Sequence, residues 1–169
     1  MNCAAHDPTP VSGSAPRPVP VPDAVAYLTG QWTVERTLLD LDTGAGGSFH
    51  GTADFRPAGD GASVLHVEDG ELSWGGAVNR AGRTLRLLAR PDGTAEVRFA
   101  DGRPFHDLDL RTGHWTTRHP CGRDGYDATF TVVSPGEWHV QWRTTGPAKD
   151  HLQRSVYRRR RSPGGAVLR

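Results

Sequence analysis

The chain has 169 residues, of which 36% are hydrophobic and 23% are charged, and its formal net charge at pH 7 is +1. This length allows one domain with its own hydrophobic core, and the near-neutral charge argues against the basic field of a nucleic-acid-binding protein. The sequence shows neither an apolar run of membrane-spanning length nor the basic start and apolar segment of a secretory signal.

The two ends of the chain differ in composition from the middle. Residues 1–22 are rich in proline, serine and alanine, so they bury too little apolar surface to offset the entropy of ordering, and we expect a disordered, proline-rich arm. Residues 161–169 continue an arginine run and are predicted to form a disordered basic tail. The only cysteines, Cys3 and Cys121, lie far apart, so we expect no structural disulfide and a cytoplasmic location.

The predicted domain, residues 23–160, opens with a short helix. In the segment PDAVAYLTG, Asp23 can cap the N-terminus, Val25 and Leu28 are three positions apart, and Gly30 ends the helix. Beyond Gly30 the hydrophobic pattern changes its period, which indicates a change of secondary structure.

The rest of the domain alternates between apolar and polar residues, which is typical of half-buried strands. In the first such segment Trp32, Val34, Arg36 and Leu38 share one face. Turn signals recur between the segments: Asp-Gly at 69, 92 and 101, Ala-Gly at 81, Thr-Gly at 112 and Pro-Gly at 135. Residues 62–70 and 71–79 are therefore expected to form separate strands. We predict an all-β fold, a single closed antiparallel up-and-down barrel of about ten strands, because closure removes exposed edges.

The short helix, the sequence Gly30-Gln31-Trp32 at the start of the first strand, and the basic last strand together resemble the lipocalin and calycin group. The resemblance implies that Trp32 closes the floor of the barrel and that an arginine of the last strand covers its ring as a cation–π partner. Arg158 and Arg159 are the candidates for this arginine.

Residues 24–160 resemble more closely a family of small bacterial proteins known only as a domain of unknown function with a lipocalin-like barrel. The similar segments include WTVERTL, FHGTADF, HVEDGEL, DGRPFHDLDL, HPCGRDGYDATF, QWRTTGPAKDH and SVYRR. This resemblance implies a fold and no reaction.

Alternation predicts which side chains enter the barrel. The apolar-rich faces carry Trp115, Thr117, His119 and Cys121, then Tyr126, Ala128, Phe130 and Val132, then Trp138, Val140 and Trp142. His119, Cys121 and Tyr126 are thus expected in the cavity or at its mouth, beside Trp142. His106 is expected to point inward with Leu108 and Leu110, and Phe105 to lie on the opposite face. The direction of the face shared by His66 and Glu68 stays open, because Leu65 and Val67 compete with it.

An inward Arg36 needs a partner, since burying an unpaired charge costs several kcal/mol. Glu68 or Asp124 can provide one. The polar groups then form either an internal network that stabilises the barrel or a pocket in which Arg36 grips an anionic or carbonyl group. Lys149 points across the barrel mouth towards such a ligand, or into water.

The leading hypothesis is that the barrel binds a small, largely apolar molecule bearing a polar or anionic group, without a cofactor, nucleic acid or membrane as partner. The candidate ligand-binding residues are Trp32, Arg36, Glu68, His106, His119, Cys121, Asp124, Tyr126, Trp142 and Lys149.

Two alternatives draw on the segment 116–130, and the second of them also on His106. One is a cofactor-free isomerase or cyclase with His119 and Tyr126 as acid and base. The other is metal or haem binding through His119 or His106, with Cys121 and Asp124 near His119 in sequence. Residues at i and i+2 of a strand lie about 7 Å apart, which is wide for two ligands of one ion, so no metal site is predicted.

Overall fold

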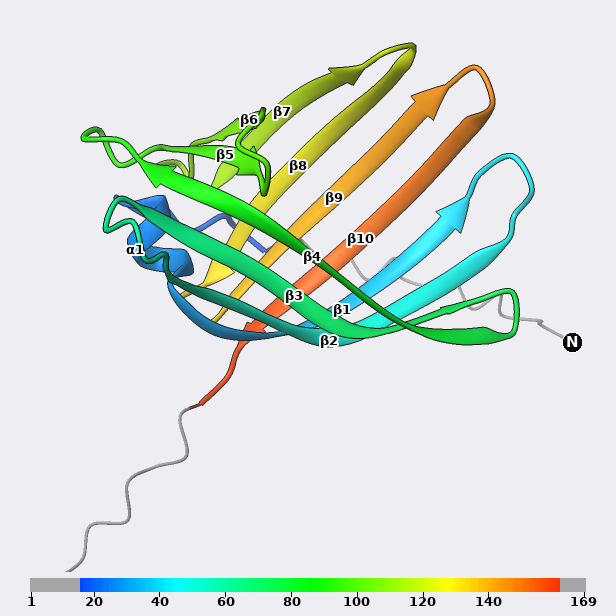
Figure 1. Ribbon diagram of the computed structural model, residues 1–169, viewed down its shortest axis with the longest axis horizontal. Coiled ribbons are helices and arrows are strands. Elements are labelled where there is room, and N and C mark those ends of the chain that lie inside the picture. The colour runs from blue at the N-terminus through cyan, green and yellow to red at the C-terminus, as the bar shows by residue number, and fades with distance from the viewer. Residues whose placement is uncertain (1–15, 162–169) are drawn as a thin grey trace, which may run out of the picture.

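The computed structural model describes residues 16–161 (Figure 1). It contains helix α1 (Ala24–Leu28) and ten strands: β1 (Gly30–Asp40), β2 (Gly46–Pro57), β3 (Ser63–Trp74), β4 (Ala77–Ala89), β5 (Ala95–Phe99), β6 (Pro104–Leu108), β7 (His114–Cys121), β8 (Asp124–Ser134), β9 (Glu137–Gly146) and β10 (Lys149–Arg159).

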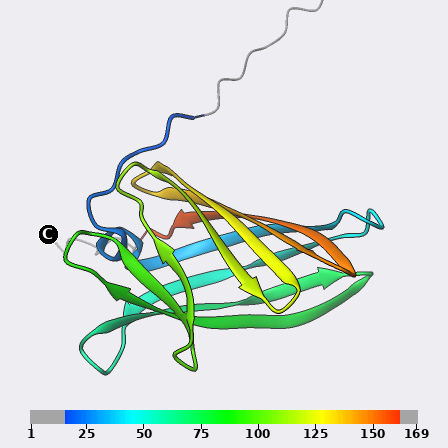
Figure 2. The same ribbon diagram turned by 90° about the horizontal axis from the view of Figure 1, so that it is seen from above.

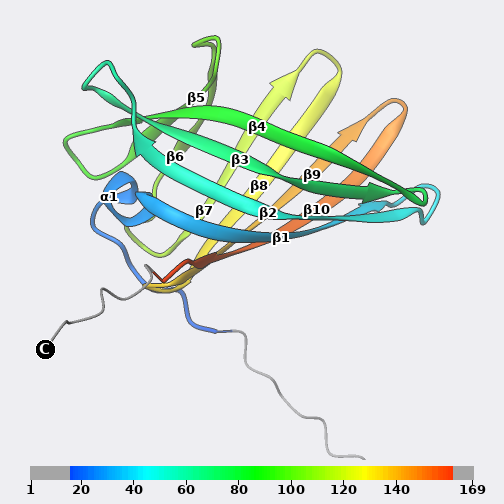
Figure 3. The ribbon, with the colours of Figure 1, turned by 60° about the horizontal axis from the view of Figure 1, so that its bottom comes forward.

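The ten strands form one antiparallel sheet in the order β6-β5-β4-β3-β2-β1-β10-β9-β8-β7. Sequential strands pair as hairpins except β6 and β7, and β1 pairs with β10 along Trp32–Asp40 to bring the two halves together. The sheet curls into a nearly closed up-and-down barrel (Figures 1 and 3). The all-β fold and its short N-terminal helix are therefore confirmed.

The seam of the barrel lies between β6 and β7, which do not pair with each other. Side chains bridge it: the rings of Phe105 and His119 lie 5.1 Å apart, and Trp115 donates its indole hydrogen to the carbonyl oxygen of Asp107 at 2.9 Å. Apart from the short strands β5 and β6, the strands form four long hairpins: β1–β2, β3–β4, β7–β8 and β9–β10. These hairpins extend away from the end of the barrel that carries α1 (Figures 1 and 2). The helix α1 thus lies at one end of the barrel, and the tips of the long hairpins lie at the other.

Two of the expected turns were wrong. Asp69-Gly70 lies inside β3 and Ala81-Gly82 inside β4, and the chain reverses instead at Gly75-Gly76, where both glycines have positive φ. Residues 71–79 therefore divide between two strands. Gly70 pairs with Gly51 of β2, and a Cβ built on Gly51 would lie 2.3 Å from the carbonyl oxygen of Asp69. These glycines allow two strands of a curved sheet to approach each other closely, and they do not form a turn.

The floor of the barrel has the tryptophan–arginine arrangement that the resemblance to lipocalins implies. Trp32 is fully buried and donates its indole hydrogen to the carbonyl oxygen of Leu28 at 2.8 Å. The guanidinium of Arg159 lies 4.1 Å from the centre of the Trp32 ring and donates to the carbonyl oxygens of Tyr27 and Thr29. Arg159, not Arg158, is the cation–π partner, and it ties β10 to the end of α1.

Val19 and Val21, in the segment that the sequence assigns to a flexible arm, lie against the barrel. The backbone amides of Val19 and Val21 donate to the carbonyl oxygens of Val132 and Leu110 at 2.9 and 3.0 Å. Both valine side chains pack against the core. The remaining predicted arm and tail, residues 1–15 and 162–169, fall outside the described residues, as does Cys3.

Candidate functional site

A narrow cavity lies inside the barrel, between the end of α1 and a layer of polar side chains. The space that the centre of a water-sized sphere can occupy is small, about 40 Å³. Its lining is mostly aromatic and aliphatic, with Arg83 as its single arginine: Leu28, Phe55, His66, Arg83, Leu85, Leu87, Val97, Phe105, His106, Leu108, Leu110, Phe130, Trp138, Val140, Trp142 and Tyr157. Such an apolar space with a few polar groups in its wall has the character of a small-molecule site.

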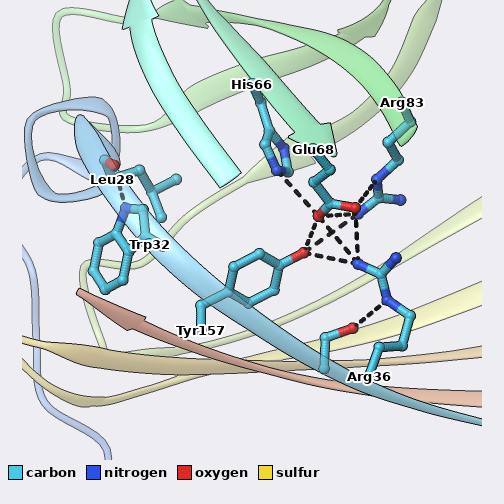
Figure 4. A network of polar contacts seen from close by, with 8 residues as sticks. Leu28, Trp32, Arg36, His66, Glu68, Arg83 and Tyr157 are labelled. Atoms are coloured by element: carbon cyan, nitrogen blue, oxygen red, sulfur yellow. Dashed lines mark hydrogen bonds and ion pairs between the residues drawn. The ribbon is translucent and has the colours of Figure 1, made fainter. Parts of the chain in front are cut away.

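The polar layer is built around Glu68 (Figure 4). Its carboxylate accepts two 3.0 Å hydrogen bonds from Nη2 of Arg36, and it also accepts a hydrogen bond from the hydroxyl of Tyr157. Arg36 further donates to Ser155 Oγ at 2.7 Å and to Tyr157 Oη at 3.0 Å. Glu68, not Asp124, is therefore the partner of Arg36, and only 10% of the Arg36 side chain is exposed.

A second arginine, Arg83 of β4, binds the same carboxylate. Its Nε lies 3.0 Å from Glu68 Oε2, and its Nη2 donates to Oε1 at 3.2 Å. About a third of the Arg83 side chain, 34%, remains exposed. Burial opposes ionisation of Glu68, but the His66 contact and the charges of Arg83 and Arg36 outweigh it and hold the pKa of Glu68 well below its usual range. The carboxylate is ionised, so two positive charges share one negative charge.

The other two neighbours of Glu68 in the cavity lining, Tyr157 and His66, are neutral. Burial, together with the charge of Glu68, raises the pKa of Tyr157 to about 12, so the phenol keeps its proton. Burial lowers the pKa of His66. His66 Nε2 lies 3.2 Å from Glu68 Oε1 without hydrogen-bond geometry, and its ring stacks on Phe55 at 4.0 Å. The layer therefore carries a net charge of +1.

The wall near the seam is aromatic. Phe105 stacks on Trp142 with ring centres 5.2 Å apart, and His106 lies 5.5 Å from the same ring. The expectation that Phe105 faces away from His106 was wrong, because the ladder between β5 and β6 shifts register after Val97. This irregularity leaves Phe105 out of the ladder and lets two consecutive side chains line the cavity.

His106 is a neutral group of this wall. Burial is the main cause that lowers its pKa to about 4. Its Nδ1 lies 2.8 Å from the carbonyl oxygen of Asp107, which can only accept, so we assign the ring proton to Nδ1. His106 Nε2 then presents a lone pair, not a charge.

The structure divides the predicted site residues into two groups. Arg36 and Glu68 meet in the polar layer, while His106 and Trp142 line the cavity and Trp32 lies in the floor. The other five predicted residues, His119, Cys121, Asp124, Tyr126 and Lys149, lie outside the cavity lining.

The second group lies at the seam and near the tips of the long hairpins. The rings of His119 and Tyr126 lie 6.2 Å apart, and His119 packs on Phe105. Cys121 is exposed, and Lys149 forms an ion pair with Asp124 at 2.7 Å. Lys149 thus points to a neighbouring hairpin, and the proposed acid–base pair is not among the residues that line the cavity.

Sequence reasoning missed Arg83, Tyr157 and Trp138 and left the direction of His66 open. Glu68 and Arg83 are direct cross-strand partners. Their pairing follows from a turn at Gly75-Gly76, so a correct choice of turn would have revealed it.

Neither a metal centre nor a membrane-spanning helix is found in residues 16–161. No group of three or more His, Cys, Asp or Glu side chains in this range is placed to hold a metal ion. No helix in the same range has the length and apolarity needed to cross a membrane.

Several solved structures resemble this barrel, and no curated protein matches the chain. An S-type phycobiliprotein lyase from Guillardia theta is 12% identical, with a TM-score of 0.62 over 82% of this chain and 91% of the lyase. A designed fluorescence-activating β-barrel is 16% identical, with a TM-score of 0.45 over 82% of this chain and 98% of the design. A DUF3598 protein of unknown function from Nostoc punctiforme is 11% identical, with a TM-score of 0.45 over 88% of this chain and 53% of that protein.

The family comparison covers most of the domain. Residues 28–159, from the end of α1 to the arginine over Trp32, match the model of a family of unknown function, DUF6314. The chain belongs to this family.

Proposed function

We propose that the protein binds a small, largely apolar molecule with an anionic group inside the barrel, and that Arg83 meets that group. One observation carries the proposal: the wall of an apolar cavity holds an arginine whose charge the interior does not balance. Two guanidinium groups face one carboxylate in the polar layer.

Arg36 and Arg83 differ in how much of each side chain is available to contact a ligand. Arg36 is enclosed by Glu68, Ser155 and Tyr157, and its role is to hold the layer together. Arg83 touches Glu68 with Nε and Nη2, lines the cavity, and keeps a third of its side chain exposed. An excess positive charge in a poorly hydrated wall favours an anionic ligand, because electrostatic attraction is weakly screened there.

The proposal is tested with two probes of nearly equal shape, 2-naphthoate and the uncharged 2-ethylnaphthalene, titrated calorimetrically into the purified protein. We expect Arg83→Met to weaken 2-naphthoate binding at least tenfold and to change 2-ethylnaphthalene binding less than twofold. Tenfold corresponds to about 1.4 kcal/mol, close to the lower end of the range for a hydrogen bond to a charged group, about 1.5–3 kcal/mol.

Arg86→Met is the matched control. Arg86 lies on the same strand with a similar exposed fraction, 32%, but pairs with Asp60 instead of the interior network. Equal losses of 2-naphthoate binding in the two variants, or no binding of either probe to the unmodified protein, would contradict the proposal.

A further inference from the structure

The cavity of the unliganded barrel is smaller than the ligand that it is proposed to bind. Its free space of about 40 Å³ holds about three waters, because one water needs about 10–15 Å³ by this measure. The fused aromatic rings of a probe such as 2-naphthoate need more room than three waters. The wall of the barrel must therefore open, and the cavity must widen, when such a molecule enters.

The seam between β6 and β7 is the part of the wall that is easiest to open. Every other pair of neighbouring strands is joined by a ladder of backbone hydrogen bonds, and no ladder joins β6 to β7 within residues 16–161. Side chains bridge the seam instead: the indole of Trp115 donates to the carbonyl oxygen of Asp107, and the ring of Phe105 packs on that of His119. Because separating two paired strands breaks several hydrogen bonds at once, opening costs least at this seam.

A groove on the surface meets the cavity at this seam. The walls of the groove include Asp107 of β6 and Thr117 and Arg118 of β7. Phe105 and His106 line both the groove and the cavity, so these two side chains lie between the surface and the interior. Phe105 is also the residue that the register shift leaves out of the β5–β6 ladder. Its backbone is therefore held less firmly than that of a paired strand residue.

We propose that the β6–β7 seam is the entrance to the cavity and that Phe105 is its gate. In the closed barrel Phe105 stacks on Trp142 and meets His119 across the seam. Movement of Phe105 away from both rings, together with separation of β6 from β7, joins the groove to the cavity. The inference rests on the proposed function for its ligand, and it concerns how fast the ligand passes, not how tightly it binds.

Trp115→Phe tests the seam without changing the cavity, because Trp115 is not among the residues that line it. The substitution keeps an aromatic ring and removes the hydrogen bond to Asp107. That bond is lost equally from the free and the liganded closed barrel, so the association and dissociation rate constants of 2-naphthoate should both rise about fivefold while Kd stays within twofold. Fivefold corresponds to about 1 kcal/mol, the usual net contribution of one hydrogen bond. Stopped-flow tryptophan fluorescence measures both rates, since Trp138 and Trp142 line the cavity.

Tyr27→Phe is the matched control at the helix end of the barrel. It also removes a side-chain donor to the backbone, since the hydroxyl of Tyr27 donates to the carbonyl oxygens of Ser134 and Glu137, and Tyr27 does not line the cavity. Both rate constants should stay within twofold of those of the unmodified protein. His119→Ala is a second seam variant, which removes the ring that packs on Phe105. It should accelerate both rates as Trp115→Phe does, and it decides the test if Trp115→Phe does not fold.

Rate constants that stay unchanged in the seam variants, or that rise as much in Tyr27→Phe, overturn the inference and leave the proposed function standing. Faster dissociation alone, with a correspondingly weaker Kd, also overturns it, because the seam residues would then determine affinity and not entry. Failure of 2-naphthoate to bind the unmodified protein overturns the proposed function and the entrance together.

Discussion

Removing the charge of Glu68 should destabilise the protein far more than removing any exposed carboxylate. In Glu68→Gln the side chain keeps its size, but Arg36 and Arg83 lose their only shared anion, and the new amide turns a donor towards two donors. Breaking a buried ion pair by removing one partner costs about 3–5 kcal/mol, because the other charge stays buried. For a chain of this length that loss corresponds to a fall in Tm of about 10 °C.

The matched control is the next residue along β3. Asp69 pairs with Arg80, but the two side chains are 60% and 72% exposed, so Asp69→Asn should cost less than about 1 kcal/mol. Urea unfolding followed by tryptophan fluorescence, with an unchanged m-value, measures both free energies of unfolding. A loss in Glu68→Gln no larger than that in Asp69→Asn would refute a charge-bearing network inside the barrel.

Two further predictions concern pH and strand packing. Burial lowers the pKa of His106 from 6.5 to about 4, so the unfolded chain binds the proton first as the pH falls. The contribution of neutral His106 to the free energy of unfolding is therefore fully present above pH 6.5 and is lost as the pH falls towards 4. Of the stability lost between pH 7.5 and 5.0, His106→Phe should remove about 2 kcal/mol, measured by urea unfolding. Gly51→Ala should cost about 1–3 kcal/mol, because its Cβ meets the backbone of Asp69, while Gly59→Ala, with open space around it, should cost almost nothing in the same experiment.

Most of the barrel could be predicted because alternation and turn residues are local signals. The face of Trp32, Val34, Arg36 and Leu38 enters the interior as expected, and the turns at 92, 101 and 112 carry glycines with positive φ. Gly51 and Gly70 show the limit of this reasoning. A glycine that serves a turn and a glycine that serves a close contact between strands look the same in one sequence, and only the pairing of distant strands distinguishes them.

The error at the β3–β4 turn also concealed half of the candidate site. With separate strands at 62–70 and 71–79, Glu68 and Arg83 are not neighbours. With one hairpin turning at Gly75-Gly76, they are direct partners. Tyr157 could not be assigned for another reason: its contact with Arg36 depends on the β1–β10 pairing, which joins the two ends of the domain. Contacts of that sequence separation leave no local signal.

The sequence left a choice between an internal network and a ligand pocket, and the interior combines features of both. A network that served stability alone would be complete with Arg36, Glu68, Ser155 and Tyr157, since these groups satisfy one another and their charges cancel. Arg83 breaks this balance: it adds a positive charge beside a carboxylate that is already paired, at the wall of an apolar cavity. Stability gains little from a surplus buried charge. The position of Arg83 therefore supports the proposed ligand pocket more than a network that serves stability alone.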